Sequence, residues 1–388
     1  MKQKQAIFFV LGITLVGVIS RVPFTIIPTV LTDVADGLGV SVNSLGILTS
    51  IPLVMFSLCS SLAPRFAEKI GLEKLFALVL GIMVLASIMR VINLPFLYLG
   101  TMILGGCIAM MNVLLPSVVL ANYPRRIGLL TAIYTTSMGL ASALASSVAV
   151  PIVRATSWKG LILFLSLIIM LAFIVWLPNS FRNHKMETNK EKQGPSLWKN
   201  KQAIALLVFG GLQSLLFYTG MTWLPTMANQ SGLSAEMAGI LASIYSLISL
   251  PFSMVIPTLA TKLSKSHRKI MLSMVCASGI IGAILLLFPN SSFSYWLVVN
   301  LLLSITVSAL FPYLLVLFSM KSDTPIQTAQ LSGMVQSGGY LLAAFGPALF
   351  GFSFDFFGSW VVATLALLIC SIVMTIALFY TERFDKIE

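Results

Sequence analysis

Long apolar stretches fill most of this 388-residue chain. Apolar residues make up 58% of it and charged residues only 9%. A water-soluble protein of this size could not bury so much apolar surface, so the solvent around the chain must be largely lipid. A helix that crosses a bilayer needs about 20 predominantly apolar residues. By that criterion the sequence predicts an all-α integral membrane protein with twelve transmembrane helices.

The predicted spans cover residues 6–32, 42–63, 74–93, 96–120, 127–152, 159–178, 202–226, 236–260, 269–288, 294–318, 328–354 and 360–380.

The basic residues set the expected orientation. The net charge is +12, but the lysines and arginines lie in short loops between apolar spans, which argues against a nucleic-acid partner. With both termini cytoplasmic, twenty of the 24 basic residues fall in inner segments, Arg154 and Lys159 fall outside, and Arg21 and Arg90 lie within spans. This bias predicts a multi-pass protein of the cell membrane with both ends inside. Nothing in the composition points to an obligate protein partner, so we expect a monomer in the lipid bilayer.

The two halves of the chain are related to one another. A polar stretch at 181–201 divides the chain into an N-terminal bundle at 1–180 and a C-terminal bundle at 202–388, and its composition predicts a flexible cytoplasmic linker. The segment that begins at Gly39 aligns without gaps to the one at Gly232, and Trp158 and Trp360 open the last span of each half. Parallel repeats of this kind predict two six-helix bundles with a binding site between them near the midplane.

The loop between the second and third spans carries a family motif. The sequence PRFAEKIGLEK from Pro64 is similar to the signature G-x-x-x-D-R/K-x-G-R/K-R/K of the major facilitator superfamily. Glu68, Lys69 and Gly71 fill its acidic, basic and glycine positions, whereas Pro64 and Leu72 depart from it. The resemblance implies the two-bundle fold and a role for Glu68, Lys69 and Gly71 in gating.

Other segments narrow the resemblance. The R-V-P of the first span, the S-I-M-R of the third and GGCIAMMNVLLPSVVLANYPRR before the fifth resemble the cyanate permease and nitroimidazole transporter branch. That resemblance implies a secondary transporter working by alternating access, with a span-one arginine that faces the cavity.

Arg21 is the strongest candidate for substrate binding. It lies near the middle of the first span, where a positive charge costs roughly 2.5–3.5 kcal/mol, and no acidic residue stands in that stretch to pair with it. Its planar fork can bind a carboxylate, a nitro group or a small inorganic anion. Pro23 and Pro28 follow and loosen the helix, so the alternative is a structural arginine that caps the freed carbonyls or joins the two bundles.

Arg90 leaves two alternatives open. It lies about 24 Å along the third span from Lys74, hence near the outer surface. It either faces the cavity and guides anions or snorkels to the outer interface.

Further polar residues inside spans are candidates to line a small, mildly polar, aromatic pocket, although hydrogen bonds between helices explain each of them equally well. These candidates are Asn112, Tyr134, Gln213, Tyr245, Gln336 and Tyr340.

The acidic residues all fall in loops or at span ends, and both histidines are predicted to be cytoplasmic. Asp33, Glu236 and Asp355 are therefore the only candidate proton carriers at outer span ends, and facilitated transport, exchange or substrate-borne proton movement is favoured. The cysteines have no metal-ligand spacing. We expect no metal, no cofactor and no enzymatic activity.

The sequence thus predicts a secondary active or facilitative transporter for a small anionic or electron-rich solute, such as a cyanate-like anion, a small carboxylate or a nitroheterocycle. The alternative is a multidrug efflux transporter for lipophilic compounds. A fixed central positive charge argues against cationic cargo.

Overall fold

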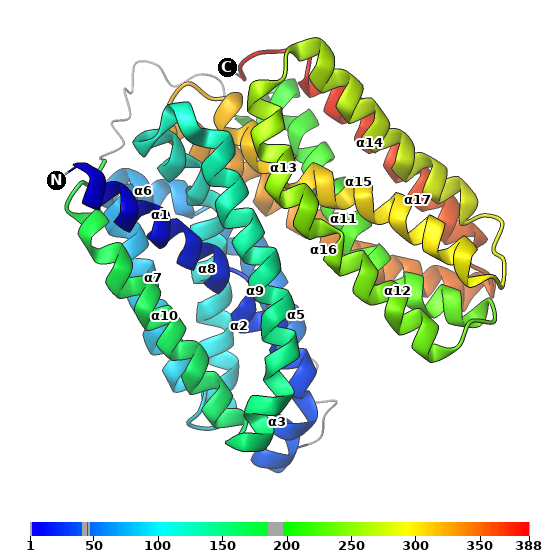
Figure 1. Ribbon diagram of the computed structural model, residues 1–388, viewed down its shortest axis with the longest axis horizontal. Helices are drawn as coiled ribbons and strands as arrows, with labels where there is room; N and C mark the ends of the chain where they lie inside the picture. The colour runs from blue at the N-terminus through cyan, green and yellow to red at the C-terminus, as the bar shows by residue number, and fades with distance from the viewer. Residues whose placement is uncertain (1, 41–44, 46, 185–196, 388) are drawn as a thin grey trace. The chain divides into compact units, whose positions relative to one another are not determined.

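A computed structural model describes residues 2–40, 45, 47–184 and 197–387, all of which lie in helices or the short connections between them. The chain forms two compact units. The first comprises Met1–Gln193 and Asp323–Gly333, and the second Gly194–Ser322 and Met334–Glu388. The N-terminal part of one long helix therefore packs with the first unit, although the sequence-based division assigns all of it to the second half. Figure 1 shows the course of the chain.

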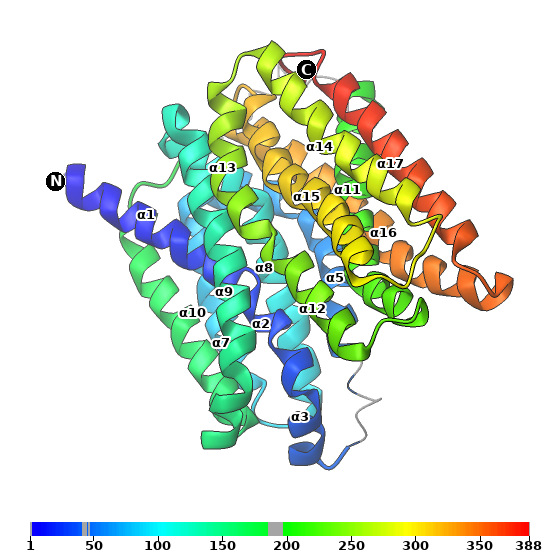
Figure 2. The ribbon, with the colours of Figure 1, turned by 45° about the vertical axis from the view of Figure 1, so that its right-hand side comes forward.

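In the first unit, the helices are α1 Lys2–Ile19, α2 Val22–Thr25, the 3₁₀ turn η1 Ile27–Val30, α3 Leu31–Leu38, α5 Ile47–Ser60, α6 Ala63–Ile70, α7 Leu72–Met89, α8 Leu94–Asn122, η2 Pro124–Arg126, α9 Ile127–Ala155 and α10 Trp158–Ser180. Helices α7, α8 and α10 run side by side (Figures 1 and 2), and α1 packs on α9 and α10.

The second unit contains η4 Leu197–Lys199, α11 Lys201–Gln230, α12 Ala235–Leu247, α13 Ser249–Lys262, α14 Lys265–Leu285, α15 Phe293–Met320, the greater part of α16 Pro325–Phe357, and α17 Val361–Thr381. Helix α11 packs on α17 and α15, and α14 lies against α15.

Ten helical segments of the described chain are long and apolar enough to cross a bilayer, and they match predicted spans three to twelve. The first predicted span is divided into α1, α2, η1 and α3 and continues to Leu38. The described part of the second corresponds to α5, and α6 begins at its last residue. Most of the predicted linker, at 185–196, lies outside the described residues.

The repeat is visible in the packing of each unit. Gly39 and Gly232, which align in sequence, both have positive φ angles, of 67° and 103°. Gly37 and Gln230 lie two residues before these two glycines. Each contacts the indole nitrogen Nε1 of the tryptophan that opens the last span of its own half, Trp158 or Trp360. A Cβ on Gly37 would lie 2.1 Å from the Trp158 Nε1 atom, and Trp360 Nε1 donates a hydrogen bond of 2.7 Å to Gln230 Oε1. The two halves therefore share one register through this region.

A buried carboxylate joins three helices at one end of the first unit. Glu73 Oε1 lies 2.6 Å from His184 Nδ1 and accepts a hydrogen bond of 2.7 Å from Asn122 Nδ2. The Trp176 indole donates to the Glu73 carbonyl at 3.0 Å. Because Glu73 is fully buried, these contacts fix the start of α7 against the ends of α8 and α10.

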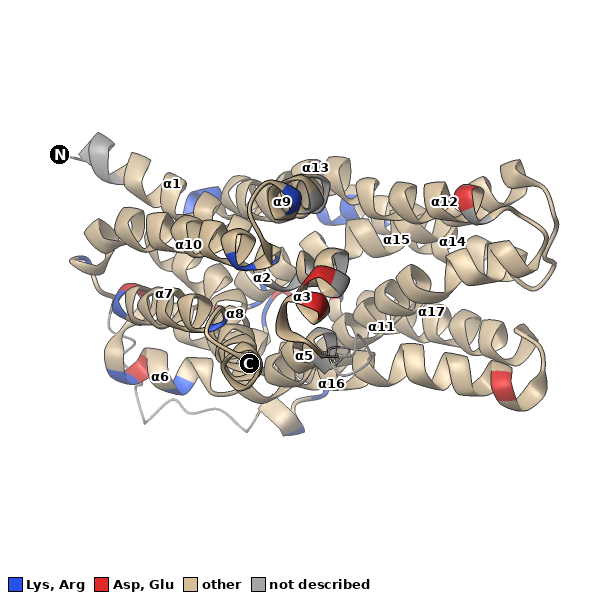
Figure 3. Cartoon of the chain, turned by 90° about the horizontal axis from the view of Figure 1, so that it is seen from below, with Lys and Arg blue, Asp and Glu red and all other residues tan. Residues whose placement is uncertain are grey.

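The second unit has a similar arrangement, but the basic residue, Arg268, lies at the start of a helix, α14, and the acidic residue follows the last helix. Glu382, which follows α17, accepts hydrogen bonds from Arg268 Nε at 2.9 Å and from the Tyr313 hydroxyl at 2.8 Å. The Lys321 ammonium lies 3.7 Å from the same carboxylate, and burial lowers the pKa of that lysine. Figure 3 shows how few charged residues the helices carry along their length. The hydrogen-bond networks around Glu73 and Glu382 therefore contain most of the buried charged residues of the described chain.

Replacing Glu382 with Gln is expected to destabilise the protein by about 3–5 kcal/mol, because Arg268 and Lys321 would remain buried without their counter-charge. The measurement is the melting temperature of the purified protein in detergent. Asp385→Asn is the matched control, since Asp385 pairs with Lys265 in solvent, and it should leave the melting temperature unchanged. Equal melting temperatures for both variants would contradict this assignment.

Replacing Gly17 with Ala is expected to destabilise by about 1–3 kcal/mol, because the added Cβ would lie 2.6 Å from the Tyr134 carbonyl oxygen and would push α1 away from α9. Gly239→Ala is the control. Nothing lies within 4 Å of a Cβ at that helical position, so alanine should be neutral or slightly stabilising there. Thermal melts of the two variants make the comparison.

Candidate functional site

The first span is interrupted directly before Arg21. Helix α1 ends at Ile19, Ser20 and Arg21 form a turn, and α2 begins at Val22 (Figure 2). Pro23 supplies no N–H to the helix, and its ring would clash with the carbonyl four residues earlier, at Ile19. Arg21 occupies the N-cap position of α2, with φ −126° and ψ −43°, and is partly exposed. The interruption thus carries a basic side chain at the centre of the predicted span.

Helix α9 packs tightly against the turn of helix that precedes the interruption. A Cβ on Gly17 would lie 2.6 Å from the carbonyl oxygen of Tyr134 and 3.1 Å from Ser137 Cβ. The Tyr134 side chain is almost completely buried. Tyr134 therefore contacts the last turn of α1, directly before the interruption.

Arg90 reaches the same interruption from the end of α7. Its side chain is 0% exposed, and its Nη1 atom donates a hydrogen bond of 3.3 Å to the Pro23 carbonyl. The guanidinium is therefore enclosed by protein and bonded to the backbone of the first span, and in this conformation it lies neither in an open cavity nor at an exposed surface. The structure brings Arg90 against the segment that follows Arg21, which the 67-residue separation of Arg90 from Pro23 does not reveal.

Asn112 lies on α8, one turn before Pro116, and is partly buried. The helix continues through this proline to Asn122.

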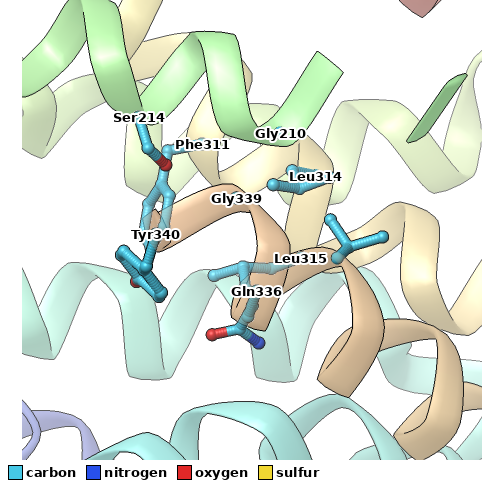
Figure 4. Close-up of a pocket in the computed structure, with 9 residues that line it drawn as sticks. Gly210, Ser214, Phe311, Leu314, Leu315, Gln336, Gly339 and Tyr340 are labelled. Carbon is cyan, nitrogen blue, oxygen red and sulfur yellow. The ribbon is translucent and has the colours of Figure 1, made fainter. Parts of the chain in front are cut away.

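The second unit contains a small pocket where α11, α15 and α16 meet (Figure 4). It is lined by Ser214, Phe311, Gln336 and Tyr340 together with apolar residues and two glycines. The backbones come close at one edge, where a Cβ on Gly339 would lie 3.3 Å from the Gly211 Cα atom. Two of the predicted binding residues, Gln336 and Tyr340, therefore line one pocket with polar and aromatic groups.

This pocket occupies the repeat position of the interruption in the first unit. Arg21 and Ser214 both lie 18 residues before the aligned glycines, Gly39 and Gly232. Tyr134 and Gln336 both lie 24 residues before Trp158 and Trp360. Gly17 and Gly210 also share a register, and each packs closely on neighbouring helices of its own unit.

Gln213 and Tyr245 have other partners. Gln213 Nε2 donates to the Val307 carbonyl at 2.8 Å, and its Oε1 accepts from Ser214 at 3.3 Å. The Tyr245 hydroxyl donates to the Phe217 carbonyl at 3.3 Å and borders a second, more apolar cavity beside Gly220. Neither side chain lines the pocket of Gln336 and Tyr340.

Sequence reasoning missed Ser214 and Phe311 as pocket residues. The signal that could have found Ser214 is its register with Arg21, which needed the repeat to be extended backward from Gly232.

The predicted gating residues lie in the last turn of α6 and in the turn that leads to α7. Gly71 has φ +91°, which favours glycine, and a Cβ there would meet the Asn183 side chain. Glu68 accepts a hydrogen bond of 3.2 Å from Gln330 Nε2, on the part of α16 that packs with the first unit. Lys69 is exposed in the last turn of α6. The loop therefore fixes a sharp turn and contacts a helix from the other half of the sequence.

Within the described ranges there is no group of three or more His, Cys, Asp or Glu residues that could hold a metal ion. The three candidate proton carriers, Asp33, Glu236 and Asp355, are exposed.

Comparison with known proteins identifies the family. Residues 13–325 and 221–387 match the Major Facilitator Superfamily. The chain is 32% identical over 382 residues to the 2-nitroimidazole transporter of Escherichia coli (strain K12), covering 96% of this chain and 95% of that one. It is also 32% identical over 378 residues to the uncharacterized transporter YycB of Bacillus subtilis (strain 168), covering 96% and 93%.

The fold agrees with a solved structure of the same superfamily. The proton:xylose symporter XylE, bound to 6-bromo-6-deoxy-D-glucose, superposes with a TM-score of 0.77 over 99% of this chain and 97% of the other. At 14% identity this likeness concerns the fold alone. The resemblance seen in the loop at Pro64 and in the R-V-P segment is thereby confirmed. The chain belongs to the major facilitator superfamily, and it is a multi-pass membrane transporter rather than an enzyme.

Proposed function

We propose that this transporter moves a small anionic or electron-rich solute by alternating access, and that Arg21 binds the negative end of that solute. The observation that carries the proposal is the position of Arg21. It is a partly exposed arginine at an interruption of the first span, where α1 ends and α2 begins.

The chemistry of Arg21 favours a planar, electron-rich group. A guanidinium presents paired N–H donors that match the two oxygens of a carboxylate or nitro group. The printed substrate of one relative, 2-nitroimidazole, carries such a nitro group, which supports the same class of cargo for this chain.

The pocket of the second unit supplies a neutral surface. We propose Gln336 and Tyr340, with Ser214 and Phe311, as candidate solute-contacting residues of that unit. In the first unit, Asn112 and Tyr134 are the further candidates, and Glu68, Lys69 and Gly71 are the proposed gating loop.

The positions of the carboxylates bear on whether solute transport is coupled to proton movement through the protein. Asp33, Glu236 and Asp355 are exposed, and the buried Glu73 and Glu382 are paired at helix ends. We therefore propose facilitated transport, exchange, or movement of a proton with the substrate itself, in the cell membrane with both termini cytoplasmic.

Replacing Arg21 with Gln is expected to abolish saturable uptake of the anionic or nitro substrate, because glutamine keeps hydrogen-bonding capacity but removes the charge. Uptake is measured in proteoliposomes, with 2-nitroimidazole and small carboxylates as the first substrates. Arg154→Gln, which removes an exposed arginine from the end of α9, should transport normally.

Two results would overturn this proposal. One is normal transport by Arg21→Gln. The other is saturable transport of lipophilic cations by the wild type and by Arg21→Gln alike, which would make Arg21 structural and favour multidrug efflux.

Replacing Gln336 with Leu is expected to raise KM at least severalfold, because the variant removes the amide group from the pocket. Gln213→Leu is the matched comparison. Its amide nitrogen donates to the Val307 carbonyl, so its loss should destabilise by about 1–3 kcal/mol. Uptake kinetics and thermal melts of the two variants make the comparison. A raised KM in Gln213→Leu together with an unchanged KM in Gln336→Leu would contradict the assignment.

A further inference from the structure

Arg90 is a fully buried cation with only part of its hydrogen-bonding capacity in use. Nη1 donates to the Pro23 carbonyl, whereas Nε and Nη2 have no hydrogen-bond partner within the described part of the chain. Nη1 is the terminal nitrogen on the Cδ side of the guanidinium, so Nε and Nη2 share the opposite edge. The two vacant donors therefore form one side-on fork, with parallel N–H bonds.

The surroundings do not supply a counter-charge. Among the described residues no carboxylate lies within 4.0 Å of Arg90, since the ion pairs are those of His184, Lys265, Arg268 and Lys321. The buried cluster around the interruption is apolar, with Val22, Ile26 and Leu97 among its members. A buried arginine without a partner is costly, and its vacant donors point to a ligand that provides the missing charge.

The interruption itself is specific to the first unit. The repeat counterpart of the first span, α11, is one continuous helix over Lys201–Gln230. Counted in the same register, the residue that corresponds to Arg90 is Ala283. Arg90 thus occurs only in the half whose first span is broken.

We propose that Arg90 is a second anion-binding residue of the transport pathway, and that its Nε–Nη2 fork selects planar groups with two acceptor oxygens, such as carboxylate, nitrate or nitro groups, over linear or spherical anions. This inference rests on the proposed function and names its substrate class. The fork is occluded in the present conformation, and the solute reaches it when the segment Val22–Val30 moves during the transport cycle.

The selectivity follows from geometry. A planar carboxylate or nitrate places two oxygens opposite two parallel N–H donors, so both charge-assisted hydrogen bonds form together. A linear anion such as cyanate or thiocyanate, or a chloride ion, can satisfy that edge only through a single acceptor atom. Lysine keeps the charge but presents a point donor without a fork.

The test measures thermal stabilisation of the full-length protein in detergent by formate, acetate and nitrate, compared with cyanate, thiocyanate and chloride at equal ionic strength. In the wild type, the planar anions are expected to bind at least about tenfold more tightly than the linear and spherical ones. Arg90→Lys should bind both classes with similar affinity. A wild type without preference, or an Arg90→Lys variant that keeps it, overturns the proposal.

A second variant separates ligand binding from support of the backbone. Arg90→Met fills the space without a charge. The loss of the hydrogen bond to the Pro23 carbonyl lowers the melting temperature of this variant under either role, so the readout is the anion preference. The variant is expected to lose the extra stabilisation by planar anions, and a variant that keeps it overturns the proposal.

Arg21→Gln, run in parallel, distinguishes this proposal from the function on which it rests. Loss of stabilisation by every anion in Arg21→Gln, with the planar preference retained in Arg90→Lys, refutes only the role of Arg90. Unchanged stabilisation in Arg21→Gln, with the preference lost in Arg90→Lys, refutes the role of Arg21 and leaves Arg90 as the anion-binding residue.

Discussion

The hydrogen bond from Arg90 to the Pro23 carbonyl holds together the part of the first unit on which Arg21 depends. In a lipid environment every backbone polar group needs a partner inside the protein, and a helix can be broken only where neighbouring segments supply one. Pro23 and Pro28 each remove an N–H from the first span. The Arg90 guanidinium, from the end of α7, donates to the loosened segment, and α9 packs against the preceding turn at Gly17. The broken span is thus held from two sides.

The positions of the spans could be predicted because a bilayer demands about 20 apolar residues, and that signal needs no knowledge of tertiary contacts. The exact interruption of the first span was harder to foresee. The prolines marked a weak point, but the break lies before them, because a proline ring excludes the carbonyl of the residue four positions earlier. For Pro23 that residue is Ile19, where α1 ends.

The environments of the charged residues could not be predicted from spacing along one helix. Counting along the third span placed Arg90 near the outer end, yet its burial depends on a carbonyl 67 residues away. Glu73 was correctly placed at a span end, but its burial depends on Asn122 and His184, which are 49 and 111 residues distant. Contacts at such separations arise from the packing of whole helices, and a single sequence contains no direct record of them.

Comparing aligned positions of the two halves distinguishes residues needed for helix packing from residues whose side chains differ between the halves. Gly17 and Gly210 agree between the halves because at both positions a neighbouring helix leaves no room for a side chain. At Arg21 and Ser214, and at Tyr134 and Gln336, the same backbone positions carry different chemistry. A shared fold does not require these differences, so they are the positions at which the proposed function places solute contacts. Under that proposal, discrimination by charge belongs to the first unit, which carries Arg21 and Arg90, and discrimination by shape and hydrogen bonding belongs to the second, whose pocket is lined by Gln336 and Tyr340.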